Sequence, residues 1–191
     1  SVSRGLGDVY KRQITYRAWD PLLQSYVAIK EYYPSGIATR SADSSKVCVP
    51  VGQEQREYHR GRIRFLKEAQ DVARFQSEPN IVSIYDYLEE NDTAYMVMEY
   101  LHGCTLKQYI REHGGRLDTD HILHICLSVL DALAVVHKAG MIHRDISPEN
   151  IFICEDLTVK LIDFGAAKQV YLDGEPVSYT HLRAHETLSD L

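Results

Sequence analysis

The sequence lacks the features of several protein classes. No unbroken apolar run approaches the ~20 residues that a helix needs to cross a bilayer. The longest apolar stretch lies within residues 122–136 and has polar breaks. There is no signal-peptide pattern, low-complexity segment or internal repeat. We therefore expect no membrane segment and no fibrous or disordered architecture in this chain.

The sequence also lacks clustered cysteines and an excess of positive charge. The four cysteines have no short metal-ligand spacing, which favours reduced thiols over disulfides or a zinc site. They are Cys48, Cys104, Cys126 and Cys154. The formal net charge is −6 and no basic stripe is present, which argues against a nucleic-acid surface.

What is present is ordinary globular composition. The 191 residues are 45% hydrophobic and 25% charged. That is enough chain for one domain or for two small lobes.

The two ends of the chain have an unusual relation to each other. One coding string for residues 3–13, read as its reverse complement, encodes residues 177–186 and the first base of the Thr187 codon. The string resembles a transposase adapter used to prepare sequencing libraries. We therefore expect residues 1–13 and 177–191 to be adapter-derived, with genuine flexible tails as the alternative, and we exclude them from fold reasoning.

The pattern between these ends predicts strands first and helices later. Residues 31–56 are rich in turn formers and are expected to be an irregular connection, and Pro79 is expected to end the first long helix. Strands are predicted at 14–19, 26–30, 81–88, 94–100, 151–153 and 159–162. Helices are predicted at 57–76, 106–113 and 119–137, the last capped by Asp118 or Thr119. This order indicates an α+β plan of two lobes.

The third predicted helix is apolar on nearly every side. Such a helix must be buried all round in a complete fold. If the segments that would cover residues 122–136 are missing from this chain, a large apolar patch is exposed, and we expect the chain to aggregate.

Four short motifs carry the chemistry. They are Val27-Ala28-Ile29-Lys30 at the end of a strand, Glu68 within a helix, the loop from His143 to Asn150, and Asp163-Phe164-Gly165. Each of the first, second and fourth motifs alone has a simpler structural reading. Their order and spacing together resemble the protein kinase signature set across residues 14–176.

The resemblance implies a role for each polar residue. Lys30 would hold the α- and β-phosphates of ATP, and Glu68 would pair with Lys30. Asp163 and Asn150 would bind Mg²⁺, with Mn²⁺ possible, through oxygen ligands. Asp145 would accept the proton of the substrate hydroxyl.

The same resemblance places an adenine pocket at the junction of the two lobes. Met98 would guard the pocket, and it can be an ordinary core methionine at the same time. Backbone groups of Glu99 and Leu101 would bind the adenine edge, and Ala28 and Phe152 would pack against the ring. The domains expected are an N-lobe at 14–98, a hinge at 99–101 and a partial C-lobe at 102–176. His143 and Phe164 would pack together.

The sequence departs from the family pattern in two places. The glycine-rich loop is missing, since Gly5 and Gly7 fall in the adapter-like segment. Ser147 stands where Ser/Thr kinases usually have a lysine that neutralises the transferred phosphate. The following Pro-Glu-Asn and the segment after Lys30 still resemble bacterial Ser/Thr kinases, and Arg144 suggests regulation by an activation-loop phosphate.

The resulting expectation is a bacterial-type, cytoplasmic Ser/Thr protein kinase that uses Mg-ATP on protein substrates. The piece itself is expected to be inactive alone, and the parent could be membrane-anchored elsewhere. A pseudokinase scaffold and an aminoglycoside-type small-molecule kinase remain alternatives. His121 and His124 are three residues apart on a helix, but no third metal ligand is evident.

Overall fold

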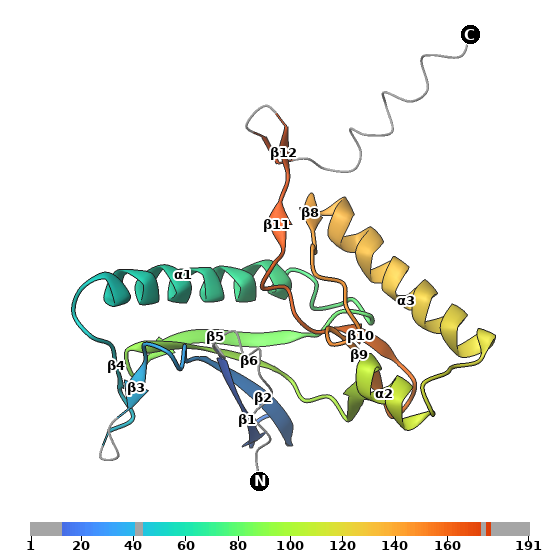
Figure 1. Cartoon of the computed structure of the whole chain (residues 1–191), viewed down its shortest axis with the longest axis horizontal. Coiled ribbons are helices and arrows are strands. Elements are labelled where there is room, and N and C mark those ends of the chain that lie inside the picture. The colour runs from blue at the N-terminus through green and yellow to red at the C-terminus, as the bar shows by residue number, and fades with distance from the viewer. Residues whose placement is uncertain (1–12, 41–43, 173–174, 177–191) are drawn as a thin grey trace. The chain divides into compact units, whose positions relative to one another are not determined.

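The chain forms two compact units (Figure 1). The computed structural model describes residues 13–40, 44–172 and 175–176. The first unit comprises the described residues up to 76 together with 83–100, and the second comprises 77–82 and the residues from 101 onward. The adapter-like ends, apart from Gln13, and the glycines at positions 5 and 7 lie outside the described residues.

An antiparallel sheet of four strands, in the order β1-β2-β6-β5, builds the first unit. The strands are β1 (Gln13–Asp20), β2 (Ser25–Tyr32), β5 (Ile84–Glu90) and β6 (Thr93–Glu99). The first predicted hairpin is confirmed, because Asp20 accepts backbone hydrogen bonds from Leu22 and Leu23 at 2.8 and 3.1 Å and so fixes the turn.

The second hairpin turns at Asn91 and Asp92. Both residues have positive φ angles, 52° and 60°. Two left-handed residues give a turn whose twist matches that of the flanking strands, and Asn and Asp tolerate this conformation. The hairpin was predicted, but β5 begins at Ile84 and not at residue 81.

Helix α1 (Gln53–Ala73) packs on one face of this sheet (Figure 1). Its buried side chains are Tyr58, Phe65, Ala69 and Val72. The ring of Tyr32 lies 5.2 Å from that of Tyr58 and 5.9 Å from that of Phe65. Gly61 faces Tyr32 where any Cβ would clash with the phenol ring. The helix predicted at about 57–76 is present, but it starts earlier, at Gln53, because Gly52 with φ +133° allows this start. It ends earlier too, at Ala73, and Phe75 donates to the carbonyl of Val72 in the turn that follows.

The connection between β2 and α1 is more ordered than its composition suggested. It contains the short antiparallel pair β3 (Thr39–Arg40) and β4 (Val47–Cys48). Arg40 forms an ion pair with Glu31, whose side chain is 1% exposed, and Tyr16 donates to the same carboxylate at 2.7 Å. The hydrogen bond to Glu31 raises the pKa of Arg40. This ion pair, whose carboxylate is buried, ties the connection to the sheet.

The second unit contains a sheet of three strands in the order β10-β9-β7. Its strands are β7 (Gly103–Thr105), β9 (Ile151–Cys154) and β10 (Val159–Leu161). Its helices are α2 (Leu106–Glu112) and α3 (Thr119–Lys138). The shorter strands are β8 (Met141–Ile142), β11 (Lys168–Gln169), β12 (Tyr171–Leu172) and β13 (Glu175–Pro176), paired as β8 with β11 and β12 with β13.

Residues 80–82 run along β10, which explains why the predicted strand 81–88 was too long. Val82 donates to the carbonyl of Leu161 at 2.9 Å, and Leu161 donates to that of Asn80 at 2.9 Å. The Asn80 side chain also donates to Val159, at 2.8 Å. These residues therefore belong to the second unit.

Helix α3 begins at the predicted cap. Asp118 accepts a hydrogen bond from the backbone N–H of His121 at 2.9 Å, and the ring of His121 also contacts it at 2.8 Å. These interactions lower the pKa of Asp118, the backbone hydrogen bond most of all. The ring of His124 contacts the carbonyl of Leu157 at 2.9 Å. Both histidines therefore have partners other than a metal.

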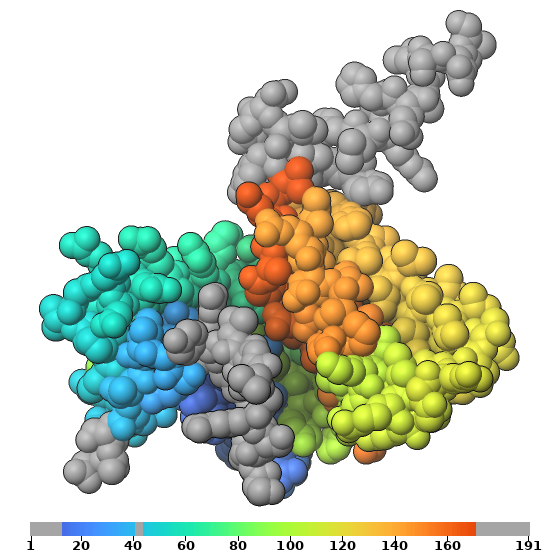
Figure 2. Space-filling view, in the orientation of Figure 1, coloured from blue at the N-terminus to red at the C-terminus, as the bar shows by residue number. Residues whose placement is uncertain are grey.

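Only part of α3 is covered. Its buried residues are Ile125, Ser128, Ala132 and Val136. The exposed apolar ones are Ile122, Leu123, Leu127 and Leu130. Figure 2 shows the helix, coloured yellow to orange, at the surface. The predicted exposed patch is confirmed. By its length and its mean hydropathy of 1.6, α3 also meets the criterion for a helix that could span a membrane. The search for unbroken apolar runs in the sequence did not detect this. Core helices of soluble proteins meet the same criterion.

Candidate active site

The loop after β8 brings two predicted site residues into contact. The Asn150 side chain donates to the Asp145 carboxylate at 2.9 Å and to the Asp145 carbonyl at 3.0 Å. The backbone N–H of Asn150 donates to the carbonyl of Ser147 at 3.0 Å, which closes a turn between Asp145 and Asn150. Arg144 has a φ of 69°, a strained value for a residue with a Cβ. The loop is therefore held in a shape that the local sequence alone would not favour.

The β9–β10 hairpin places Asp163 beside this loop. Leu161 pairs with Ile151 at the end of the hairpin. One step further on, Ile162 donates to the carbonyl of Asn150 at 3.1 Å. Asp163 follows directly and accepts the backbone N–H of Gly165 at 2.9 Å, so that its side chain is fixed by its own turn. Antiparallel pairing thus brings together residues that the motif spacing separates.

His143 and Phe164 form the packed base of this arrangement. Both are buried, and their rings lie 4.6 Å apart, as the sequence predicted. Burial lowers the pKa of His143 despite the neighbouring carboxylates of Asp163 and Asp145. The backbone N–H of Asp145 donates to the Nδ1 atom of His143 at 3.4 Å. A neutral imidazole that accepts at Nδ1 suits this position.

A residue that sequence reasoning missed anchors the loop from outside. Lys107, in α2, forms an ion pair with Glu149 at 2.6 Å, and its backbone N–H donates to the carbonyl of Pro148 at 3.0 Å. The hydrogen bond from Lys107 lowers the pKa of Glu149. No local motif marks Lys107, because its partners lie about forty positions away along the chain.

The first unit carries the other predicted residues. Lys30 lies on β2 opposite Met96, and Glu68 lies on α1; both are partly buried. Lys30 forms no ion pair with any residue that the structure describes. The pairing of Lys30 with Glu68 therefore stays a prediction.

The residues predicted to hold adenine divide between the units. Ala28 pairs directly with the buried Met98 across β2 and β6. Glu99 donates its backbone N–H to Ser83 at 3.0 Å, and its carboxylate accepts from Ser83 at 2.6 Å. The Glu99 N–H is therefore engaged by the residue that precedes β5. Leu101 and the partly buried Phe152 belong to the second unit.

The donor set of the second unit suits a hard divalent cation. Asn150 uses its amide nitrogen on Asp145, which leaves its amide oxygen for a metal. Asp163 uses one carboxylate oxygen on Gly165 and keeps the other. Mg²⁺ commonly binds through one or two protein oxygens, and phosphate oxygens and water complete its coordination. No denser cluster of metal-binding side chains occurs among the residues described.

Comparison with known families decides what this arrangement is. The sequence profile of the protein kinase domain family matches residues 37–187. The chain belongs to the protein kinase domain family. The family implies the use of ATP and a divalent metal in general.

Similar bacterial proteins carry the same family name. A probable serine/threonine-protein kinase of Clostridium perfringens is 42% identical over 118 residues, 62% of this chain and 17% of that protein. One from Clostridium acetobutylicum is 34% identical over 81% of this chain and 20% of that protein. The serine/threonine-protein kinase PrkC of Bacillus subtilis is 45% identical over 54% of this chain and 16% of that protein. The chain thus spans about a fifth or less of these relatives.

A solved structure confirms the fold. PpkA-294 in its apo form matches with a TM-score of 0.76 and 33% identity. The match covers 86% of this chain and 57% of the solved chain. The two units are thus the parts of a kinase fold that this sequence contains.

Proposed function

We propose that the parent protein is a cytoplasmic Ser/Thr protein kinase that transfers the γ-phosphoryl group of Mg-ATP to a protein hydroxyl. The observation that carries the proposal is the loop in which Asn150 fixes the Asp145 carboxylate, with Asp163 held beside it by the hairpin. The relatives named Ser/Thr kinases support the substrate class.

Phosphoryl transfer depends on positioning and on neutralising charge. Asp145 would orient the substrate hydroxyl and take its proton, and the hydrogen bond from Asn150 keeps its carboxylate in place. Asn150 and Asp163 would hold the cation, which supplies charge neutralisation at the phosphates. Lys30 would bind the α- and β-phosphates, positioned by Glu68.

The nucleotide base would be bound by the residues predicted above to hold adenine. Ala28 and Met98 lie opposite each other across β2 and β6 and would contact the ring, as would Phe152. Because the N–H of Glu99 is engaged by Ser83, Glu99 would contribute its carbonyl and Leu101 its N–H.

Ser147 stands two residues after Asp145, where Ser/Thr kinases usually have a lysine that neutralises the transferred phosphate. We expect the chemical step to be slow but present. If the reaction required the positive charge of that lysine, the protein would bind nucleotide without transferring phosphate.

The test uses the protein encoded by the uninterrupted gene. Phosphate transfer from γ-labelled ATP to a general protein acceptor is measured for the wild type and for Asp145→Asn. We expect the substitution to lower the rate at least about 100-fold while nucleotide affinity changes little. Transfer that survives the substitution would refute the role of Asp145. A wild type that binds ATP but transfers nothing would refute the kinase activity itself.

We further propose that residues 14–98, 99–101 and 102–176 are the N-lobe, hinge and partial C-lobe, except that residues 77–82 group with the second unit, and that 1–13 and 177–191 are adapter-derived. The antisense relation between the two ends supports the second statement. Long-read sequencing of the parent gene tests it. Finding both peptides inside an uninterrupted reading frame would show that they are genuine protein.

A further inference from the structure

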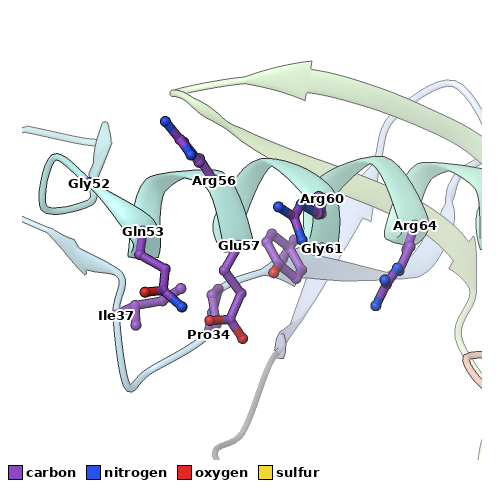
Figure 3. Close-up of a pocket in the computed structure, with 10 residues that line it drawn as sticks. Pro34, Ile37, Gly52, Gln53, Arg56, Glu57, Arg60, Gly61 and Arg64 are labelled. Carbon is purple, nitrogen blue, oxygen red and sulfur yellow. The ribbon is translucent and has the colours of Figure 1, made fainter.

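The first unit contains a cavity that the kinase reaction does not use. Its volume is about 710 Å³, within the ~300–1,000 Å³ common for ligand pockets. It lies between the first half of α1 and the connection that follows β2 (Figure 3). It is lined by Tyr32, Pro34, Ile37, Gly52, Gln53, Arg56, Glu57, Arg60, Gly61 and Arg64.

Three arginines give the cavity its charge. Arg56, Arg60 and Arg64 are four residues apart, a spacing that places them along one side of a helix. All three are exposed, and none forms an ion pair or side-chain hydrogen bond with a residue that the structure describes. By contrast, Arg40 and Arg62 are paired with Glu31 and Glu89.

The only acidic residue of the lining is Glu57. Three guanidinium groups therefore outnumber one carboxylate, in a chain whose formal net charge is −6. A concentration of unpaired positive charge on an acidic protein attracts anions selectively. Arginine suits phosphate especially well, because its planar fork of donors matches two phosphate oxygens.

The cavity also has an apolar part, beside the polar side chain of Gln53. Pro34 and Ile37 come from the connection, and the buried Tyr32 is held against α1 at Gly61. Figure 3 shows Glu57 and Arg64 extending toward the side on which Pro34 and Ile37 lie, whereas Arg56 extends away from them. Charge and apolar surface thus meet in one cavity, with Arg56 at its rim.

We propose that this cavity binds a phosphorylated segment of a partner protein. Arg60 and Arg64 hold the phosphate, and a neighbouring aliphatic side chain of the segment packs on Pro34 and Ile37. A free phosphate would leave the apolar part unused, and a nucleic acid would need a longer basic surface than these residues provide. The proposal does not depend on phosphotransfer by this protein.

The experiment measures fluorescence anisotropy of a labelled nonapeptide with the 191-residue chain. The probe carries one phosphothreonine flanked by leucine and glutamate. The comparison probes are the same peptide with plain threonine and a single-stranded DNA oligonucleotide of equal charge. We expect the phosphopeptide to bind at least about tenfold more tightly than either comparison probe, because charge-assisted hydrogen bonds to two arginines are lost without the phosphate.

The variants assign the binding to the cavity. Arg60→Gln with Arg64→Gln should weaken phosphopeptide binding at least about tenfold, and Arg56→Gln should weaken it less. The matched control, Arg74→Gln with Arg116→Gln, removes the same charge from exposed arginines outside the cavity and should leave binding unchanged.

Circular dichroism shows whether each variant retains its helices. If the double glutamine variant unfolds, Arg60→Lys with Arg64→Lys replaces it, since this change keeps the charge but removes the fork of donors. Ile37→Ser tests the apolar part and should weaken binding of the leucine peptide but not of an alanine version. The proposal is overturned if the phosphopeptide does not bind, if either comparison probe binds equally well, or if the control variant weakens binding as much as the cavity variant.

Discussion

The uncovered face of α3 leads to a quantitative expectation about self-association. Ile122, Leu123, Leu127 and Leu130 are 47, 53, 60 and 58% exposed. Complete burial of such a side chain is worth ~1.5–3 kcal/mol, so burying the exposed half yields ~1 kcal/mol each and ~4 kcal/mol for the face.

Two copies that meet through this face would gain ~8 kcal/mol before the cost of association. That cost is at least ~4 kcal/mol. The difference corresponds to a dissociation constant of roughly 1 mM, or somewhat tighter if neighbouring apolar surface contributes. We therefore expect weak, concentration-dependent association that progresses to aggregation.

The perturbation is to change all four residues to glutamine. These side chains are not part of the buried set of α3, so the fold should survive, and the association should disappear. Sedimentation velocity over a concentration series is the measurement. The matched control is Ile125→Gln, at a position that is 7% exposed, which should reduce the free energy of unfolding and leave the exposed face intact.

Two results would contradict this reasoning. A wild-type chain that stays monomeric well above ~1 mM would show that the apolar gain of this face does not exceed the cost of association. Association that persists in the quadruple variant would show that another surface is responsible.

Three further predictions concern stability, each read from thermal or urea unfolding. Arg40→Met should lower the free energy of unfolding by ~3 kcal/mol, because the buried Glu31 carboxylate would keep the hydrogen bond from Tyr16 but lose its only cation in the described part of the chain. Adding Glu31→Leu should restore part of the loss, and equal losses in the single and double variants would contradict the pairing. Gly61→Ala should destabilise although alanine favours helices, because its Cβ meets Tyr32, and a gain in stability would show that the ring moves away freely. The pKa of Asp118 is lowered from its ordinary value of 3.8, so the ionised carboxylate stabilises the fold above that pH, and this contribution should be lost as the pH falls below it. Asp118→Asn should keep the helix cap but flatten the pH dependence of stability between pH 5 and 3. An unchanged pH profile in this variant would contradict the assignment.

Local signals in the sequence were sufficient for most of the fold. The hairpin at Asp20 and the cap at Asp118 depend on contacts within three residues, so the pattern alone identified them. The loop from His143 to Asn150 could be recognised because its residue types are rarely combined for structural reasons. The position of Asp163 beside this loop depends on the pairing of β9 with β10, which spacing alone does not specify.

The failures occurred where distant residues decide the structure. The connection after β2 looked irregular because its order comes from Arg40 reaching Glu31, which lies on a strand. The start of α1 was missed because Gly52 was taken as a loop signal when it caps the helix. The arginines of the cavity were overlooked although their four-residue spacing was visible in the sequence. Only the structure showed that they lack partners among the residues described.

The excursion of residues 80–82 along β10 has a consequence for anyone dividing this protein. The chain leaves the first unit after residue 76, returns at 83 and leaves again after 100. An expression fragment that ends at residue 100 would therefore include a segment that belongs to the second unit, and Ile81 and Val82 would lack their pairing partner Leu161. Conversely, a protease that severed one of these three crossings would leave two covalent tethers, and the nicked protein would still migrate as a single species under native conditions.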